Sequence, residues 1–237
     1  LMNGYMLHKT ALINNVLPTL YPDNTAVNKI LAQSMNYSLN AGGKRLRPLM
    51  LMAAADAAGA DGEKYVRIGC AIELIHTYSL IHDDLPAMDN DDYRRGKLTN
   101  HKVYGDAMAI LAGDALLTHA FDIIASEPDI APSILIRVIH EISCAAGPEG
   151  MVGGQAIDLL SENKHIDITE LRKLHSAKTG ALFCAAIRSG AILAEASNDE
   201  LNALTVYAKE FGLAFQITDD ILDVIGDDKK IGKPVGS

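Results

Sequence analysis

Apolar residues recur at steps of three and four along most of the chain, which is the spacing of a helix with a buried face. Within residues 63–82, Val66, Cys70, Leu74 and Ile81 follow this spacing. The same period predicts helices over residues 106–126, 133–147, 168–196 and 198–226. We find no convincing run of alternating strand-type residues. The pattern therefore predicts an all-α fold of long helices.

Glycine, proline and asparagine separate these helical stretches, and an Ala-rich run such as "LMAAADAAGA" suits close helix packing. The expected N-cap of the last helix is Asn198-Asp199. The breaks are Gly42-Gly43, Gly59 to Gly62, Gly96 to Gly105, Pro128 to Pro132 and Gly147-Pro148. Because no low-complexity linker lies between the helices, we expect residues 1–237 to form a single domain.

Composition narrows the function classes. The chain has 237 residues and a net charge of −9, which argues against a general nucleic-acid binder and fits a protein that collects cations. The three cysteines (Cys70, Cys144 and Cys184) are far apart in apolar surroundings, so we expect buried free thiols in a reducing compartment. We also expect no signal peptide, because polar residues and Pro18 interrupt the first apolar stretch, and no membrane span.

An acidic cluster lies in the last predicted helix, in "FQITDDILDVIGDD". Asp219 and Asp223 are four residues apart, so a helix places both carboxylates on one face, with Gln216 on the same stripe. Like charges at this spacing destabilise an isolated helix, and a divalent cation compensates for them. Carboxylate oxygens favour hard ions such as Mg²⁺ and Ca²⁺.

A second acidic cluster lies in "SLIHDDLPAMDNDDYRRGKLTNH", residues 79–101. Asp83 and Asp89 are six residues apart and would diverge on a regular helix. Pro86 breaks the helical hydrogen bonds between them, so we expect the chain to bulge and the two aspartates to converge on shared metal ions. The alternative is a solvated loop whose acids cap a helix. A hand-type calcium loop is excluded, because Tyr93 and Arg94 occupy positions that need a ligand and a glycine.

Basic groups accompany both clusters. In "AGGKRLRPLM", Lys44, Arg45 and Arg47 follow a Gly-Gly turn, and Pro48 suits the first turn of the next helix, where cations and N–H groups favour phosphate. Such a stretch is also common as solvated surface. The other basic positions are Arg94-Arg95, Lys178 beside Thr179, Lys229, Lys230, Lys233 and His76. Magnesium carboxylates with dispersed cations suggest a diphosphate substrate, and no GxxxxGK[ST] loop marks it as ATP or GTP.

These motifs together resemble the short-chain trans-isoprenyl diphosphate synthases, most closely the bacterial farnesyl diphosphate synthases. The matching segments are "GGKRLRP", residues 79–101, "LAGDALL", "GGQAIDL", "KTGALF" and "FQITDDILDVIGD", in family order. The resemblance implies an all-α bundle around a deep apolar cavity, a homodimer and a cytoplasmic location. It also implies further helices after "GKPVGS", so residues 1–237 are expected to lack or not to show them.

The resemblance implies a role for each matching residue. Mg²⁺, for which Mn²⁺ could substitute, is held by Asp83, Asp89, Asp219 and Asp223, with Asp84 and Asp220 in support. The allylic diphosphate binds Arg94, Lys178 and Lys233, and isopentenyl diphosphate binds Gly43, Lys44, Arg47, His76 and Arg95. Thr179, Gln216 and the backbone near Lys178 stabilise the allylic cation formed when the carbon–oxygen bond ionises.

Product length and two alternative functions remain open. Tyr78 and Ser79 lie five and four residues before Asp83, where a growing apolar tail would travel, and the resemblance implies that an aromatic residue there limits the product to farnesyl diphosphate. Tyr78 as simple core packing is the rival interpretation, and geranylgeranyl diphosphate is the rival product. One alternative function is a terpene cyclase, which would not need "GGKRLRP" to hold a second diphosphate. The other is a non-catalytic regulatory subunit of a heteromeric synthase, which would typically have lost metal aspartates.

Overall fold

The computed structural model describes residues 2–24, 26–161, 164 and 166–225, without the side chains of residues 219, 220 and 222–225. The chain divides into two compact units. Unit 1 comprises Leu1–Leu49, Val66–Ser126 and Val224–Ser237, and unit 2 comprises Met50–Tyr65 and Glu127–Asp223. The expectation of one domain over residues 1–237 stays a prediction, and each unit is described by itself.

Helices dominate the described part of unit 1, and one short hairpin interrupts them. Its elements are α1 (Met2–Val16), η1 (Leu17–Thr19), α2 (Lys29–Leu39), the first turn of α3 (Leu46–Ala57), α4 (Val66–Asp83), β1 (Tyr93–Arg94), β2 (Lys97–Leu98), α5 (Asn100–Tyr104) and α6 (Asp106–Ala125). The strands are antiparallel, with Tyr93 opposite Leu98. The sequence pattern did not predict this hairpin, because two-residue strands are too short to show alternation.

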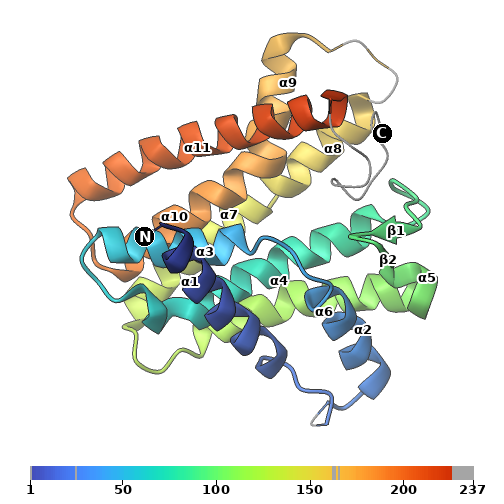
Figure 1. Cartoon of the computed structure of the whole chain (residues 1–237), viewed down its shortest axis with the longest axis horizontal. Coiled ribbons are helices and arrows are strands. Elements are labelled where there is room, and N and C mark those ends of the chain that lie inside the picture. Colours follow the sequence, from blue (N-terminus) through green and yellow to red (C-terminus); the bar gives the residue numbers. More distant parts are fainter. Residues whose placement is uncertain (1, 25, 162–163, 165, 226–237) are drawn as a thin grey trace. The chain divides into compact units, whose positions relative to one another are not determined.

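The core of unit 1 is built around α4, which is buried over most of its circumference. Figure 1 shows α4 and α6 running side by side, and α1 and α2 also pack against α4. Close approach requires small residues: a Cβ atom at Gly69 would lie 3.1 Å from the Cβ of Pro48. Pro48 itself lies in the first turn of α3, as predicted from the sequence.

Unit 2 contains the remaining described elements. They are the rest of α3, η2 (Gly62–Tyr65), α7 (Pro132–Ala146), α8 (Met151–Ser161), α9 (Ile168–His175), the π-helical turn η3 (Ser176–Gly180), α10 (Ala181–Leu193) and, up to Asp223, α11 (Asn198–Ile225). Helix α10 packs against α7, and Ala54, Ile187 and Ala208 form a shared apolar cluster. The predicted helix over 168–196 is therefore present as α9, η3 and α10.

Two local predictions in unit 2 need correction. The N-cap of α11 is Ser197, not Asn198-Asp199: Ser197 Oγ accepts from the Glu200 N–H at 3.3 Å, and the Glu200 carboxylate accepts from the Ser197 N–H at 2.8 Å. This reciprocal pair is a capping box. All three cysteines are free, but only Cys70 is fully buried, while Cys184 is partly exposed and Cys144 is exposed.

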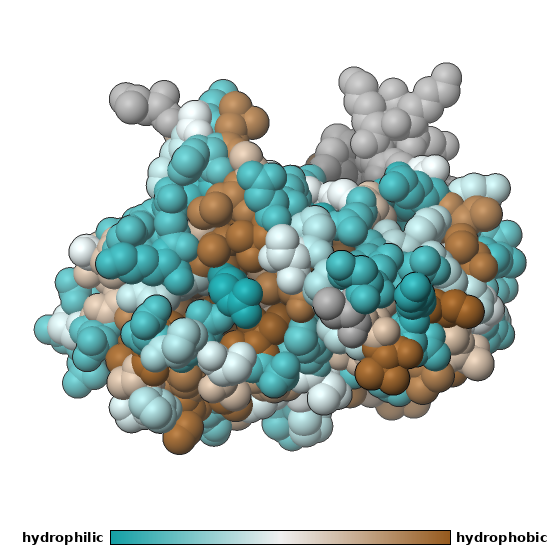
Figure 2. All heavy atoms as spheres, turned by 90° about the horizontal axis from the view of Figure 1, so that it is seen from below, coloured by the Kyte–Doolittle hydropathy of each residue, from teal (hydrophilic) through white to brown (hydrophobic). Residues whose placement is uncertain are grey.

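Surface apolar residues and one apolar helix bear on the membrane prediction. Figure 2 shows hydrophobic side chains interspersed with hydrophilic ones on the face in view, which is ordinary for folded proteins. Within the part of the chain that the structure describes, one helix, α6, is long and apolar enough to cross a membrane. Because α6 packs against α4, α2 and α5, this is weak evidence for a span, and the absence of a span stays a prediction.

Candidate active site

The first acidic cluster forms a turn where α4 ends at Asp83. The backbone N–H of Asp89 donates to the carbonyl oxygen of Asp83 at 2.9 Å, and Asn90 has a positive φ of 55°. The chain therefore ends the helix and folds back, instead of bulging within a continuing helix as predicted from Pro86. The turn brings the backbones of Asp83 and Asp89 within hydrogen-bonding distance, and the convergence of their carboxylates on shared metal ions stays a prediction. Asp83 is half-buried and Asp89 is exposed.

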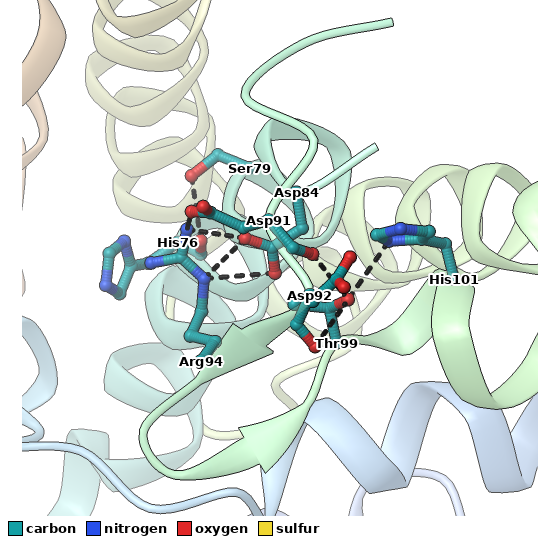
Figure 3. Close-up of polar contacts among 8 residues, drawn as sticks. All are labelled: His76, Ser79, Asp84, Asp91, Asp92, Arg94, Thr99 and His101. Carbon is teal, nitrogen blue, oxygen red and sulfur yellow. Dashed lines mark hydrogen bonds and ion pairs between the residues drawn. The ribbon is translucent and has the colours of Figure 1, made fainter. Parts of the chain in front are cut away.

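The side chain of Asp84 is buried, unlike those of Asp83 and Asp89, and it forms an ion pair. Arg94 of β1 binds it through two nitrogens, with Nε and Nη2 donating to Oδ1 at 2.8 and 2.6 Å. Arg94 Nη2 also lies 3.9 Å from Asp91, and Figure 3 shows the guanidinium directed at both carboxylates. The structure thus ties Arg94, expected at the allylic diphosphate, to the acidic turn itself.

The hairpin that carries Arg94 is anchored by buried polar side chains that the sequence analysis did not single out. Thr99 Oγ1 donates to the carbonyl oxygen of Asp91 at 2.8 Å and lies 3.1 Å from His101 Nδ1 (Figure 3). Asn100 Nδ2 donates to the carbonyl oxygen of Ser34 on α2 at 2.8 Å. One signal of these residues is present in the sequence, because "LTNH" at the end of the acidic motif contains Thr99, Asn100 and His101. Their contacts with α2 cannot be read from the sequence.

The Gly-Gly turn lies against the tip of this hairpin. Arg95 Nη1 donates to the carbonyl oxygen of Gly42, and a Cβ atom at Gly43 would lie 2.8 Å from the same nitrogen. Gly43 also has a positive φ of 128°. A side chain at this position is therefore disfavoured both by the contact with Arg95 and by the backbone conformation. Lys44 is exposed on this turn. Two segments that are 53 residues apart, expected to bind isopentenyl diphosphate together, are therefore in contact.

Arg45 has a different role from its basic neighbours. Its guanidinium is buried and forms an ion pair with Glu73 of α4, with 2.8 Å between Nη1 and Oε1. It also donates to the carbonyl oxygen of Leu39 at 2.6 Å and to Asn14 Oδ1 at 3.1 Å. These contacts hold the turn in place, so Arg45 is structural.

His76 of α4 lies in a field of positive charge. Burial, together with the charges of Arg47, Arg95, Arg94 and Arg45, holds the pKa of His76 well below its ordinary value. The imidazole is therefore neutral at pH 7, with one N–H donor and one acceptor nitrogen. The surrounding cations make this part of unit 1 suited to an anion with several negative charges.

This shift predicts how stability depends on pH. The unfolded histidine binds a proton below about pH 6.5 and the folded one does not, so stability falls as pH drops through that value, by up to about 1.4 kcal/mol per pH unit. We expect His76→Gln to lose less stability than wild type between about pH 7.5 and pH 5. Urea unfolding at both pH values measures this. The exposed His140→Gln is the control, and parallel curves for His76→Gln and wild type would contradict it.

The residues expected to stabilise the allylic cation lie in unit 2. Lys178 and Thr179 are in the π-helical turn η3, a feature that often marks functional sites. Lys178 Nζ donates to Asp158 Oδ2 of α8 at 2.5 Å. Gln216 lies one turn after Gly212, where a Cβ atom would be 3.2 Å from the Cα of Gly180. The turn η3 and α11 are therefore in contact. Asp158, in "GGQAIDL", is a partner that sequence reasoning did not assign.

Some expected site residues lie outside the described part of the chain. They are the side chains of Asp219, Asp220 and Asp223, and the whole of Lys233. Among the described residues, no three His, Cys, Asp or Glu side chains are grouped to hold a metal ion. The carboxylates of Asp83 and Asp89 nevertheless fit Mg²⁺ by donor type and by the backbone contact that joins them.

Tyr78 and Ser79 lie on α4 before the acidic turn, as expected. Tyr78 is 6% exposed, and Ser79 Oγ donates to the carbonyl oxygen of His76 at 2.8 Å. Burial and the charge of Asp83 raise the pKa of Tyr78 above its ordinary value. The tyrosine hydroxyl is therefore neutral at pH 7 and lies within the field of the acidic turn.

Comparison with known proteins supplies further findings. A family model described as polyprenyl synthetase matches residues 28–237. The chain is 54% identical over 209 residues to the farnesyl diphosphate synthase of Geobacillus stearothermophilus, covering 87% of this chain and 70% of that protein. It is 46% identical over 234 residues to the geranylgeranyl diphosphate synthase of Cyanophora paradoxa, covering 98% and 77%.

A solved structure agrees with these matches. The apo crystal structure of an FPP/GFPP synthase from Zymomonas mobilis superposes with a TM-score of 0.89 at 41% identity. The match covers 96% of this chain and 84% of that one. The all-α fold class expected from the helical period is confirmed.

Proposed function

The chain belongs to the polyprenyl synthetase family, and we propose that it is a prenyltransferase that joins an allylic diphosphate to isopentenyl diphosphate head to tail. The allylic substrate is dimethylallyl or geranyl diphosphate, and farnesyl diphosphate is the product. The similarity to farnesyl diphosphate synthases supports this choice. The observation that carries the proposal is the contact of the Gly-Gly turn with the arginine-bearing hairpin beside an acidic turn.

The isopentenyl diphosphate site is proposed at Gly43, Lys44, Arg47, His76 and Arg95. Backbone atoms of the Gly-Gly turn allow close approach of a diphosphate, and the guanidinium groups supply charge-assisted hydrogen bonds. The neutral His76 adds a donor without adding to the repulsion among the arginines. Binding here holds the nucleophilic double bond of isopentenyl diphosphate in a fixed orientation.

The allylic diphosphate is proposed to bind Lys178, Arg94 and Lys233. Arg94 stays anchored by Asp84, which fixes its orientation before substrate arrives. The Asp158 carboxylate holds the Lys178 ammonium group in the same way. Thr179 Oγ1, the Gln216 amide oxygen and the carbonyl oxygens of η3 supply fixed dipoles for the allylic cation. The isopentenyl double bond attacks this cation, and the proton lost in the following step passes to the released diphosphate.

The proposed metal ligands are Asp83, Asp89, Asp219 and Asp223, with Asp84 and Asp220 in support. When bound, Mg²⁺ neutralises the diphosphate charge and so favours its departure, and Mn²⁺ is a proposed substitute. The backbone hydrogen bond from the Asp89 N–H to the Asp83 carbonyl oxygen supports the pairing of the first two ligands. The remaining coordination positions fall to other carboxylates, water and substrate oxygens.

Assembly and location complete the proposal. We place the enzyme in the cytoplasm as a homodimer. Exposed apolar side chains in unit 1, such as Val103 of α5 and Ile110 and Leu111 of α6, support an association surface.

Geranylgeranyl diphosphate is the second candidate product. One of the similar proteins is a geranylgeranyl diphosphate synthase, and the side chain of Ser79 is small.

A single assay tests the proposal. Purified protein is incubated with dimethylallyl diphosphate, excess labelled isopentenyl diphosphate and Mg²⁺, and the products are separated by chromatography after phosphatase treatment. We expect farnesol as the main alcohol and no product when the metal is chelated. Geranylgeraniol as the main alcohol would favour the second candidate. The absence of any prenyl product from folded protein would refute the proposed function.

A further inference from the structure

A histidine side chain supports Tyr78 from one turn further along α4. The rings of Tyr78 and His82 meet edge to face, with centroids 5.7 Å apart and an interplanar angle of 80°. Residues four apart on a helix share a face, so this contact follows from the backbone. Tyr78 is almost fully buried, so the imidazole limits where its ring can lie.

His82 is in turn held by α6. Its Nε2 lies 3.0 Å from the carbonyl oxygen of Ile110. A carbonyl oxygen only accepts hydrogen bonds, so Nε2 carries the proton. This bond and the ring contact with Tyr78 together fix the imidazole between the two helices, which run side by side in Figure 1.

Gly113 of α6 provides the space that the imidazole occupies. A Cβ atom at this position would lie 2.1 Å from His82 Nε2 and 2.6 Å from Cδ2. The three atoms nearest to that Cβ all belong to His82. This contact explains the glycine in "LAGDALL", a motif to which the proposed chemistry assigns no role. Because Gly113 has no side chain, the His82 imidazole lies directly against its backbone, and we call this position the seat of His82.

We infer that His82, seated on Gly113, is a positioning residue that fixes the ring of Tyr78 and thereby sets the length of the prenyl chain that the enzyme makes. The inference rests on the proposed function, in which Tyr78 closes the path of the growing tail. Neither His82 nor Gly113 contacts the reacting atoms in this account. Both act through the tyrosine: without the imidazole, the ring turns into the vacated space and the path lengthens by one five-carbon unit.

The test is a set of product profiles measured with excess isopentenyl diphosphate. In His82→Ala, the ratio of twenty-carbon to fifteen-carbon product should rise by about tenfold, the upper end of what one edge-to-face ring contact is worth. Tyr78→Ala should raise it further. The double variant should match Tyr78→Ala, because His82 acts only through Tyr78. The ratios are compared at matched total conversion of isopentenyl diphosphate, so a lower turnover caused by an effect of His82 on the neighbouring Asp83 does not imitate this result.

The variant Gly113→Ala tests the same contact by a change in α6 instead of α4. Its Cβ displaces the imidazole, so the ratio should rise as in His82→Ala. Once His82 is alanine, the added methyl group meets no ring, and the double variant should match His82→Ala alone. Gly113→Ala also serves as the second route to a result if His82→Ala fails to fold.

His119 of α6 is a matched control. Its Nε2 lies 3.1 Å from the carbonyl oxygen of Leu20, and its ring meets Tyr21 edge to face at 5.4 Å. His119→Ala therefore removes the same two kinds of contact elsewhere in unit 1, and its product ratio should equal that of wild type.

The outcomes separate this inference from the proposed function. If wild type makes prenyl products and folded His82→Ala and Gly113→Ala keep its product ratio, the inference is overturned and the proposed function stands. An equal shift from His82→Ala in the Tyr78→Ala background would overturn it too, because the effect would not pass through Tyr78. A folded wild type that makes no prenyl product at all would overturn both.

Discussion

Asp83→Asn is expected to lower kcat by more than about 100-fold while the helical fold persists. Loss of a group that only supports a metal ligand already costs roughly 10–100-fold, so loss of a proposed ligand should cost more. Asp83 lies in the last turn of α4, where the helix dipole disfavours a carboxylate. Removing its charge should therefore leave the thermal midpoint within about 4 °C of wild type.

Steady-state kinetics at saturating Mg²⁺ and both substrates, with circular dichroism on the same preparations, measure these two quantities. Asp129→Asn is the control, since Asp129 is an exposed aspartate in the loop before α7. Its kcat should equal that of wild type. A folded Asp83→Asn variant with near-normal kcat would show that Asp83 holds no catalytic metal.

Glu73→Gln is expected to have the largest effect on stability. The variant leaves Arg45 buried without its carboxylate, and breaking a buried ion pair costs about 3–5 kcal/mol. For a chain of this size the thermal midpoint should fall by roughly 6–20 °C. Because Arg45 also holds the carbonyl oxygen of Leu39, the Gly-Gly turn should loosen, and the KM for isopentenyl diphosphate should rise.

Lys102→Met provides a matched comparison for this prediction. The Lys102–Asp92 ion pair has the same 2.8 Å separation, but both side chains are substantially exposed. An exposed pair contributes only about 0–1 kcal/mol. Calorimetry or urea unfolding on both variants compares the two sites. If Glu73→Gln costs no more than Lys102→Met, the buried pair does not hold the turn.

The sequence by itself determined the fold class and the residue types of the site. Helical periodicity is a local property, so the spacing around Val66, Cys70 and Leu74 was enough to predict α4, and the same holds for α6, α7 and α11. The two acidic clusters and the family motifs identified the chemistry, because metal and diphosphate binding need particular side chains. Local steric rules also placed Pro48 in the first turn of α3.

Only the tertiary structure decided which of several similar residues does what. Arg45 and Arg95 both follow short turns in basic motifs, yet burial against Glu73 makes the first structural, while the second contacts the Gly-Gly turn. Asp84 and Asp83 are adjacent, yet Asp84 is buried against Arg94, while Asp83 is only half-buried at the end of α4. Such differences depend on which distant segment packs against each side chain, and spacing along the chain carries no information about that.

The same reason accounts for the predictions that failed and for the residues that were missed. The hairpin and the exposure of Cys144 depend on short or surface contacts that leave no periodic pattern. The Ser197 cap is different, because the local S-x-x-E spacing of Ser197 and Glu200 is itself a sequence signature of a capping box. The pairing of Lys178 with Asp158 and the seat of His82 on Gly113 join separate helices. The sequence specified these side chains, but packing between helices brought them into contact.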